Sequence, residues 1–462
     1  MDIKEIIAKD RPISDIISDL KAKTIKVPEW AVLQKEYDPR MHPVMKDPSY
    51  RDKVVKGQIV KMSRITFAWQ RLATNRMAGL IFGIPVKRVY KPKNDAEKAA
   101  GQIMEAIFKK NRIDSMNLER GKNMFASCEN VTIWYTQEQP TSYAGYDTRL
   151  KLRCKNFTPM KDCNIFPLFD EYDDLIALSL EYSRAEGTKS VLYFDTYTKD
   201  EHIRWCTSSG DNKEVLREKI GIGKIPGVYL YRDTPIWEDE SNNVYESEWT
   251  MSRSGNYIRK NARPTWVEFT NNAVQHGKEP AGNSEDRNIL RYGQDDKAGY
   301  VTWNQANESI KFYTDEIKRN FFMDLQLPDM SMENMKTTPM SGEARKMVFI
   351  DCQMKVLDEA GRWQEAFDRE VNIIRAFAKK MFPQYEKAFD TVQVDIVITP
   401  FQIKDESERT KNITDATGGK QIMSQRTGIA QLGKVDDVDA ELKQIQEEQA
   451  QETNNLFNEP TE

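Results

Sequence analysis

The chain has 462 residues and a net charge of −4 at pH 7, from 68 basic and 72 acidic side chains. Hydrophobic residues make up 39% and charged residues 30%, which is typical of a globular protein and excludes a wholly disordered one. The near balance of charge argues against a protein that holds nucleic acid by bulk positive charge. No run of residues approaches the roughly 20 apolar positions of a membrane-spanning helix, and the N-terminus lacks an apolar signal segment. We therefore expect a chain made and kept in a cytoplasm, without membrane contact.

The first 238 residues predict one α+β unit. Residues 59–82 indicate a helix, because Ile65, Trp69, Leu72 and Arg76 have helical spacing before Gly83 and Pro85. Asn94 and Glu97 resemble a capping box at the start of a second helix, with an apolar stripe that extends to Phe108. Five strands are predicted from β-branched and aromatic residues: Val86–Tyr90, Val131–Tyr135, Ile176–Tyr182, Ser190–Tyr197 and Val228–Tyr231.

Two helices then bracket a small β insert. Residues 239–261 predict a weakly amphipathic helix rich in Ser and Asn, which we expect to face neighbouring chains or water rather than its own core. A second helix is predicted from the spacing of Ala306, Ile310, Tyr313, Ile317 and Phe321. Between them lie three short β-type pieces: Trp266–Phe269, Ile289–Tyr292 and Tyr300–Trp303.

A methionine-rich loop and a very long helix follow. The loop, residues 329–340, has no periodicity and contains Met330, Met332, Met335, Lys336 and Met340. Ser341 is a plausible N-cap for a helix that extends to Lys380, about 60 Å at 1.5 Å per residue. Gly361 favours a kink near its centre. One face of the helix is apolar, through Met347, Ile350, Met354, Leu357, Phe367, Val371, Ile374 and Ala378.

The C-terminal part begins with a clearly alternating strand, Thr391–Thr399. Three short helices are predicted beyond Pro400, near Glu406–Asp415, Ser424–Leu432 and Val438–Gln449. Residues 434–462 hold nine acidic and two basic side chains, so residues 1–433 carry a net charge of +3.

Motifs for catalysis, metal binding or nucleotide hydrolysis are largely missing. Neither Gly223-Lys224 nor Gly419-Lys420 meets the spacing of a phosphate-binding Walker loop. The three histidines, His42, His202 and His276, offer little material for a His-based site, and we expect them to be surface or hydrogen-bonded residues. The five cysteines form no C-x-x-C pair and indicate free structural thiols: Cys128, Cys154, Cys163, Cys206 and Cys352. We predict no catalytic residue, metal or cofactor.

One acidic cluster leaves an enzymatic alternative open. Asp170, Glu171, Asp173 and Asp174 could hold divalent cations for phosphoryl transfer, which would make the chain a metal-dependent DNA-processing enzyme. We favour a charged turn instead, because carboxylates adjacent in sequence point in different directions and metal pairs usually gather ligands from separate elements. A structural capsid or adaptor protein without DNA passage is the other alternative.

The order of elements and several segments resemble the portal proteins of tailed bacteriophages, of the Gp6-like class. The segments MAGLIFGIPVKRVY (Met77–Tyr90) and IFPLFDEYDDLIALSLEYSR (Ile165–Arg184) are similar to the entry into the family's wing domain and to its paired strands. The most specific match is Phe321–Ile350, where Leu-Pro-Asp-Met followed by Ser-Gly-x-Ala marks the tunnel loop and the start of the long helix. Residues Ser424–Glu448 are similar to the crown helices.

The resemblance implies a portal fold with wing, helical stem, small β-rich clip and α-helical crown, assembled as a ring. Its implied boundaries are a wing at 1–238, stem helices at 239–262 and 305–324, a clip at 263–304, a tunnel loop at 325–340, the long kinked helix and a wing strand at 341–400, and a crown with the acidic tail at 401–462.

The family also implies a function and partners. Its members form closed rings, typically of twelve subunits, at one capsid vertex of the virion, after assembly in the bacterial host cytoplasm. Double-stranded DNA passes through the ring without sequence specificity, pumped in by a separate terminase. The other implied partners are a head-tail connector or adaptor and the major capsid and scaffold proteins. In this scheme Met330, Met332, Met335, Lys336 and Met340 face the channel or pack on the neighbouring wing, and Met347, Ile350, Met354 and Leu357 serve core and subunit packing.

Overall fold

The computed structural model describes most of the chain, as two compact units. The described residues are 3–22, 25–55, 58–187, 189–207, 212–261, 265–269, 297–301, 307–327, 350–401, 406–418, 422–433, 435 and 438–457. The first unit comprises Met1–Asp329 and Lys355–Pro400, and the second Met330–Met354 and Phe401–Glu462.

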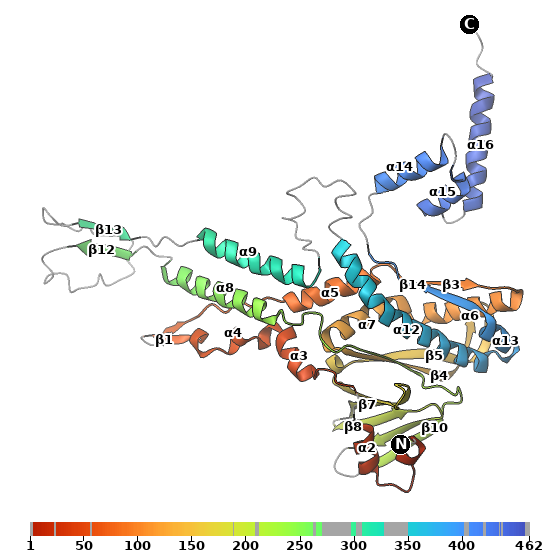
Figure 1. Cartoon of the computed structure of the whole chain (residues 1–462), viewed down its shortest axis with the longest axis horizontal. Coiled ribbons are helices and arrows are strands. Elements are labelled where there is room, and N and C mark those ends of the chain that lie inside the picture. The colour runs from red at the N-terminus through yellow and green to blue at the C-terminus, as the bar shows by residue number, and fades with distance from the viewer. Residues whose placement is uncertain are drawn as a thin grey trace. The chain divides into compact units, whose positions relative to one another are not determined.

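Two antiparallel sheets form the centre of the first unit (Figure 1). The three-stranded sheet has the order β11-β4-β5, and the five-stranded sheet the order β10-β9-β8-β7-β6. Apolar side chains of β4, β6 and β7 pack between the two sheets. The strands are β4 (Glu129–Tyr143), β5 (Tyr146–Phe157), β6 (Cys163–Phe169), β7 (Leu175–Glu186), β8 (Lys189–Tyr197), β9 (Glu201–Cys206), β10 (Lys213–Lys219) and β11 (Gly227–Tyr231).

Strand alternation gives each sheet two different faces. On β7, Leu178 packs toward the three-stranded sheet, whereas its neighbour Ala177 packs against the N-terminal helices on the outer face. Those helices are α1 (Ile3–Ile6) and α2 (Ile13–Leu20), and they cover the five-stranded sheet with five isoleucines and Leu20.

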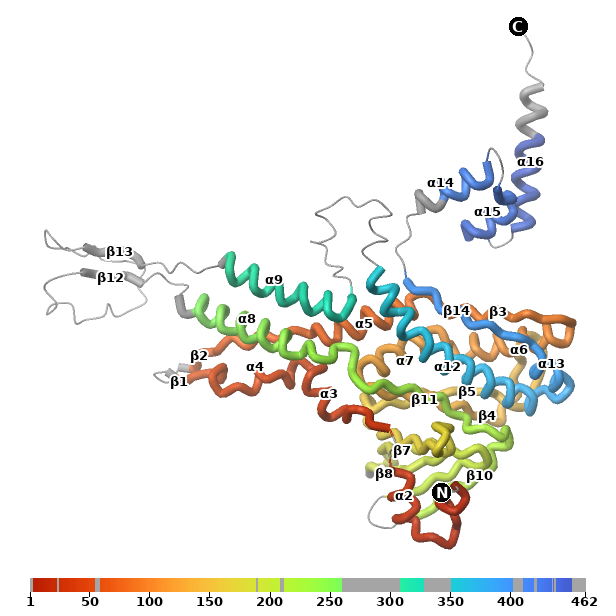
Figure 2. The backbone as a smooth tube through the Cα atoms, viewed as in Figure 1, coloured from red at the N-terminus to blue at the C-terminus, as the bar shows by residue number. Residues whose placement is uncertain are grey.

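Helices cover the other face of the three-stranded sheet, and Figure 2 traces them around β4 and β11. They are α5 (Trp69–Phe82), α6 (Asp95–Lys110), α7 (Ile113–Ser127) and α12 (Ile350–Met381). A small antiparallel sheet joins β3 (Lys87–Lys91) to β14 (Gln393–Val397), and α13 (Glu386–Thr391) packs against α6 beside it.

The remaining elements of the first unit are short, apart from one pair of longer helices. Helix α8 (Ser241–Asn261) packs along α9 (Asn307–Asp324), with α4 (Pro43–Lys46) on α8 as well. Two hairpins complete this region: β1 (Lys53–Val55) with β2 (Gln58–Val60), and β12 (Thr265–Phe269) with β13 (Lys297–Val301). Helix α3 (Trp30–Tyr37) and 3-10 turns at Pro39–Met41, Pro48–Tyr50, Pro159–Lys161 and Pro383–Tyr385 connect the other elements.

The second unit is helical in its described part. It contains α14 (Glu406–Thr417), α15 (Gln425–Leu432) and α16 (Val438–Phe457), with α15 packed on both of the others. Ser424 caps α15 by accepting a bond from the Thr427 N–H, and Gly433 ends it with a φ of 67°. Helix α16 continues to Phe457, so the predicted end near Gln449 was too early. No helix among the described residues is both long and apolar enough to cross a membrane.

The predicted α+β class is confirmed, and the structure corrects several details. The five predicted strands, the helix capped by Asn94 and both long helices on either side of the β insert are present. The helix predicted over 59–82 begins only at Trp69, and residues 61–68 are not helical. Helix α12 is continuous through Gly361, and its bounds do not test the predicted kink. The predicted piece Ile289–Tyr292 and residues 341–349 of the long helix lie outside the described residues.

Candidate functional site

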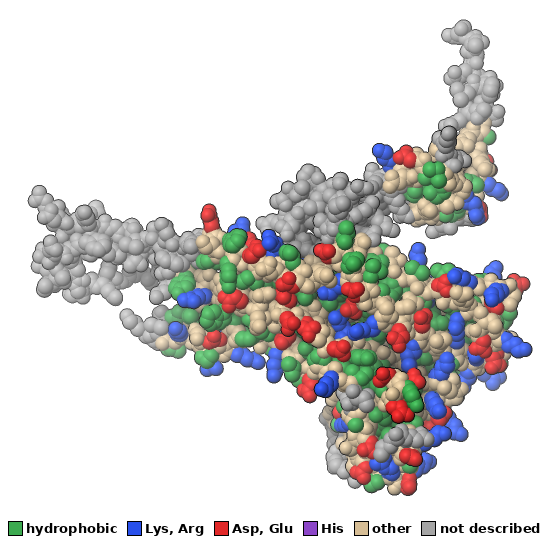
Figure 3. Space-filling view, in the orientation of Figure 1, with side chains coloured by type: hydrophobic (Ala, Val, Ile, Leu, Met, Phe, Trp, Pro, Cys, Tyr) green, Lys and Arg blue, Asp and Glu red, His purple; other side chains and the backbone are tan. Residues whose placement is uncertain are grey.

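The C-terminal end of α9 packs against helix α5 of the same unit. Phe321 and Phe322 are buried there. The ring of Trp69 lies 5.5 Å from that of Phe321, and the guanidinium of Arg76 lies 4.3 Å from the centre of the Phe322 ring. The outer side of α9 is different, since Phe312 is 71% exposed. Figure 3 shows hydrophobic side chains among charges of both signs over these two helices.

The inner face of α8 holds an extended segment of the same chain. Glu248, Ser252 and Asn256 lie one helical turn apart, and their oxygens accept backbone N–H bonds from every second residue of the segment 63–67. These bonds are Ser63 to Asn256 at 2.6 Å, Ile65 to Ser252 at 2.8 Å and Phe67 to Glu248 at 2.7 Å.

This arrangement corrects two expectations. Residues 63–67 cannot extend helix α5, because their N–H groups are bonded to side chains of α8. Helix α8 is also not directed wholly away from its own chain, since Val244, Ser247, Glu248 and Ser252 are buried. Ser241, Ser252 and Asn256 form hydrogen bonds to other elements of the subunit, which accounts for part of the scarcity of bulky aliphatic side chains on this helix.

A buried histidine completes the attachment of α8. His42 Nδ1 lies 2.6 Å from Glu248 Oε1, and His42 Nε2 lies 2.8 Å from the carbonyl oxygen of Glu36. A carbonyl oxygen only accepts hydrogen bonds, so Nε2 carries a proton. Both side chains of the His42–Glu248 pair are fully buried. His42 is therefore a hydrogen-bonded structural residue, as we expected from the sequence.

Helix α12 is attached to the core by a buried ion pair. Arg120 of α7 donates to both carboxylate oxygens of Glu370, at 2.6 and 3.1 Å. Trp134 Nε1 of β4 donates to the same carboxylate at 3.0 Å. Arg120 is 2% exposed and Glu370 is 1% exposed. Neither this cluster nor helix α7 was predicted, because the buried face of α7 includes Asn117, Arg120 and Asn123 and lacks an apolar repeat.

The predicted packing residues on the long helix are surface residues of the single chain. Ile350, Met354 and Leu357 are 50%, 58% and 63% exposed. Met347 and all five predicted channel residues (Met330, Met332, Met335, Lys336 and Met340) lie outside the described residues, so the structure does not test them.

The acidic cluster at 170–174 forms the turn between β6 and β7. The carboxylate of Asp170 accepts the backbone N–H groups of Tyr172 and Asp174, both at 2.9 Å. Such bonding stabilises a turn and engages Oδ1 of this carboxylate. Within the described parts of the chain, no group of three or more His, Cys, Asp or Glu side chains is placed to hold a metal ion.

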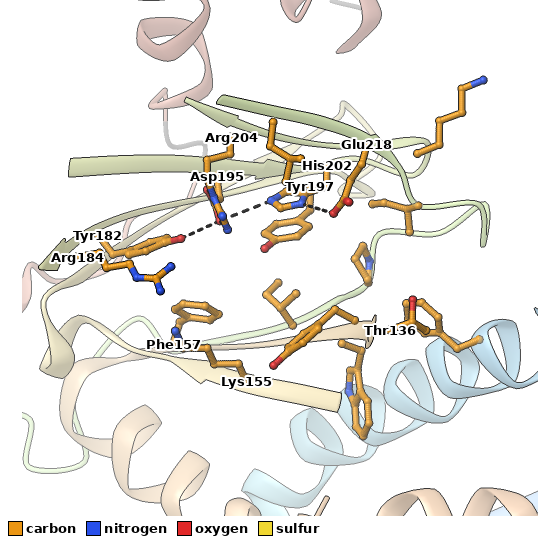
Figure 4. Close-up of a pocket in the computed structure, with 18 of the residues that line it drawn as sticks. Thr136, Lys155, Phe157, Tyr182, Arg184, Asp195, Tyr197, His202, Arg204 and Glu218 are labelled. Carbon is orange, nitrogen blue, oxygen red and sulfur yellow. Dashed lines mark hydrogen bonds and ion pairs between the residues drawn. The ribbon is translucent and has the colours of Figure 1, made fainter. Parts of the chain in front are cut away.

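A cleft lies between the two sheets of the first unit (Figure 4). One wall carries Asp195, which accepts two bonds from Arg204 at 2.7 and 2.8 Å and one from the Tyr182 hydroxyl at 3.0 Å. Burial alone would raise the pKa of Asp195, but the bonds from Arg204 and His202 outweigh it and hold that pKa below its ordinary value. This cluster was not predictable from local pattern, since Asp195 and Arg204 meet only through the register of β8 with β9.

The second histidine lies in the same wall. His202 stacks on Tyr197, with ring centres 4.3 Å apart, and its Nδ1 lies 2.9 Å from Glu218 Oε1. The ionisable groups of this wall therefore form ion pairs or hydrogen bonds mainly with one another. The aromatic rings of Tyr182 and Tyr197 also line this wall.

Comparison with known proteins identifies the family. A family model described as phage portal protein, SPP1 Gp6-like, matches residues 21–455. The chain belongs to this family of phage portal proteins. Its role is accordingly that of a portal protein, and the portal fold inferred from the sequence is confirmed. The family is a structural one. A comparison with curated proteins found no match.

Solved structures similar to this portal protein come from gene transfer agent (GTA) particles. The neck of an empty GTA particle, computed with C6 symmetry, has a TM-score of 0.45 at 9% identity, over 89% of this chain and 96% of that chain. The virion of a native particle has a TM-score of 0.40 at 10% identity, over 90% and 98% of the two chains. The neck of the native particle with C12 symmetry has a TM-score of 0.39 at 10% identity, again over 90% and 98%.

Proposed function

We propose that this portal protein closes with identical copies, typically twelve, into a ring whose central channel carries double-stranded DNA during packaging and ejection. The observation that carries this proposal is the match of the portal family model to residues 21–455, nearly the whole chain. We place the ring at one capsid vertex of the virion, after assembly in the bacterial host cytoplasm.

We assign the parts of the portal as follows. The wing comprises 1–238 together with the long helix and strand of 341–400. The stem comprises 239–262 and 305–324, the clip 263–304, the tunnel loop 325–340 and the crown 401–462. The pairing of α8 with α9 and the antiparallel β12 and β13 between them in sequence support the stem and clip assignments.

Exposed apolar side chains support closure with further copies. Phe312 and Met323 lie three turns apart on α9 and are 71% and 61% exposed, and Leu357 on α12 is 63% exposed. Contiguous exposed apolar patches mark interaction surfaces, and we assign these side chains to the contacts between copies. In a ring, a face of one copy meets a different face of the next, so each subunit needs two such surfaces.

The channel has to let DNA slide. Each phosphate neutralised by a bound cation adds a counterion-release contribution to affinity, and several contacts per subunit around a ring would trap the duplex. A net charge of −4 and a tunnel loop with four methionines and Lys336 as its one basic residue suit weak contacts without sequence specificity. We assign Met330, Met332, Met335 and Met340 to this loop, and Met347, Ile350, Met354 and Leu357 to packing within and between subunits.

We infer the partners by analogy with the family. A terminase and a head-tail connector or adaptor dock on the clip, and the major capsid and scaffold proteins surround the ring. We further propose that the chain needs no cofactor or metal and has no catalysis of its own, and the use of Asp170 Oδ1 in its turn supports this.

Mass measurement of the purified protein tests ring closure. We expect a particle of about twelve chains in native mass spectrometry and a ring with an open centre in negative-stain images. Leu357→Asp should shift the population to smaller species, while Val215→Asp, which places the same charge on the exposed side of β10, should leave rings intact. A monodisperse monomer or hexamer of the unaltered chain would contradict the proposal. Divalent-metal-dependent DNA cleavage that Asp173→Ala abolishes would instead favour the enzymatic alternative.

A further inference from the structure

The cleft between the two sheets has the size of a ligand site. Its volume is about 640 Å³, within the range of roughly 300 to 1,000 Å³ that small-molecule sites occupy. One wall comes from β7 to β10 and the other from β4 and β5, and Phe377 and Lys380 of α12 lie at one end. The lining comes mainly from strand side chains of the two sheets, and Ile220 and Pro226 lie outside the strands.

The charge of the cleft is unbalanced. Its two acidic residues are engaged, Asp195 by Arg204 and Glu218 by His202. Four further cations line it: Lys155, Arg184, Lys219 and Lys380. Figure 4 shows Lys155 and Arg184 on opposite walls near Phe157 and Tyr182. Among the described residues, neither of these two cations has a carboxylate partner, and an anion between the walls would relieve the repulsion of the like charges.

Aromatic rings lie beside these cations. Phe157 projects from one wall, and Tyr182 and Tyr197 from the other, as Figure 4 shows. The ammonium of Lys155 lies 4.8 Å from the centre of the Phe157 ring and 5.9 Å from that of Tyr182. Aromatic side chains next to free cations form the combination that binds nucleotides without reading their sequence, because bases stack on the rings while the cations hold the phosphate.

We propose that this inter-sheet cleft binds one nucleotide unit, with its phosphate between Lys155 and Arg184 and its base against Phe157 and Tyr182. Two sources would supply the same chemistry, a free nucleoside monophosphate or the 5′-phosphorylated end of a single DNA strand. The inference does not depend on ring closure or on DNA passage through the channel, since every residue that carries it lies within one subunit.

Equilibrium binding to the full-length protein tests this site. The probes are deoxyadenosine monophosphate, deoxyadenosine, inorganic phosphate, and a short single-stranded oligothymidylate with and without a 5′-phosphate. We expect the monophosphate or the phosphorylated strand to bind at least about tenfold more tightly than deoxyadenosine or phosphate alone. Deoxyadenosine lacks the phosphate that the cations bind, and inorganic phosphate lacks the base that packs on the rings. Tighter binding of the free monophosphate would identify the ligand as a nucleoside monophosphate. Tighter binding of the phosphorylated strand would identify it as the 5′ end of a DNA strand.

Matched variants locate the binding. The double variant Lys155→Ala/Arg184→Ala should weaken binding at least about tenfold, and Phe157→Leu should weaken it for the monophosphate but not for inorganic phosphate. Lys87→Ala/Lys213→Ala removes the same charge from exposed positions outside the cleft and should change affinity less than about twofold. Far-UV circular dichroism establishes that each variant is folded.

Three results would overturn the inference. The first is that neither the monophosphate nor the phosphorylated strand binds at millimolar concentration. The second is equal weakening by the control pair, which would indicate attraction by overall charge. The third is tighter binding of an acidic peptide than of either nucleotide probe.

Discussion

Replacing Glu370 by alanine should be among the most destabilising single changes in the chain. The substitution leaves the guanidinium of Arg120 buried at 2% exposure without a counter-charge, and it removes the acceptor of Trp134 Nε1. Breaking a buried ion pair by removing one partner costs about 3–5 kcal/mol, and an orphaned buried N–H adds about 1–3 kcal/mol. The sum, about 4–8 kcal/mol, is a large share of a folding free energy of about 5–15 kcal/mol. Because the unfolding entropy is about 2.1 cal/mol/K per residue, this loss should lower the unfolding temperature of a unit of this size by about 5–10 °C.

Two companion variants separate the charge from the packing. Glu370→Gln keeps the shape and one acceptor, so its unfolding temperature should lie between those of the unaltered chain and the alanine variant. Arg120→Met/Glu370→Leu removes both charges and should recover most of the loss, because a well-packed apolar pair often matches a buried ion pair in stability. Differential scanning calorimetry at one fixed protein concentration measures all three. A loss below about 1 kcal/mol for Glu370→Ala would refute the reasoning, since it would mean that water reaches Arg120 without cost.

Three further outcomes are expected from the same core. Gly227→Ala should destabilise by about 1–3 kcal/mol in urea unfolding, because a Cβ there would collide with side chains of both sheets, whereas Gly79→Ala in the open part of helix α5 should stabilise by about 0.5–1 kcal/mol. Burial raises the pKa of the Cys128 and Cys163 thiols to about 12, so peptide mapping should find iodoacetamide on them at about pH 8 only after unfolding. The depressed pKa of Asp195 contributes stability above the ordinary carboxyl pKa of 3.8, and this contribution is lost as the pH falls through the lower folded-state value. Unfolding free energy should therefore drop in this acid range, and Asp195→Asn should flatten the drop.

Features that depend on local chemistry were predictable from the sequence. The side chain of Asn94 accepts the N–H of Glu97 at 2.9 Å, as the capping pattern predicted, whereas Glu97 accepts the N–H of Lys93 at 2.7 Å, one residue before the expected donor. The alternating sequence Thr391–Thr399 predicted strand β14, which the structure has at Gln393–Val397, with Thr391 at the end of α13. Neither feature needs information from a distant part of the chain, apart from a bond that Thr391 adds to Glu97.

Features that depend on distant partners were not predictable. Ile65 fits the helical spacing of the residues after it, yet its N–H is bonded to Ser252, 187 positions away. Helix α7 lacks a continuous apolar stripe because Arg120 on its buried face is matched by Glu370, 250 positions away. In both cases a tertiary hydrogen bond overrides the local sequence pattern. The free-energy cost of burying a polar group is small when the group has a hydrogen-bond partner, and the partner is not visible in the local sequence.

The polar face of α8 also determines how the helix is turned relative to its own subunit. Four residues of helix rise about 6.0 Å, and two residues of extended chain span about 6.6–6.8 Å. The spacing between successive acceptors (248, 252 and 256) therefore equals the spacing between successive donors (67, 65 and 63) to within about 1 Å. A shift of the extended segment by one residue would turn its N–H groups away from all three acceptors, so only one register satisfies them. An apolar face would tolerate sliding and rotation, whereas this set of directional bonds fixes the helix, and with it the direction in which exposed residues such as Trp249 and Ile258 point.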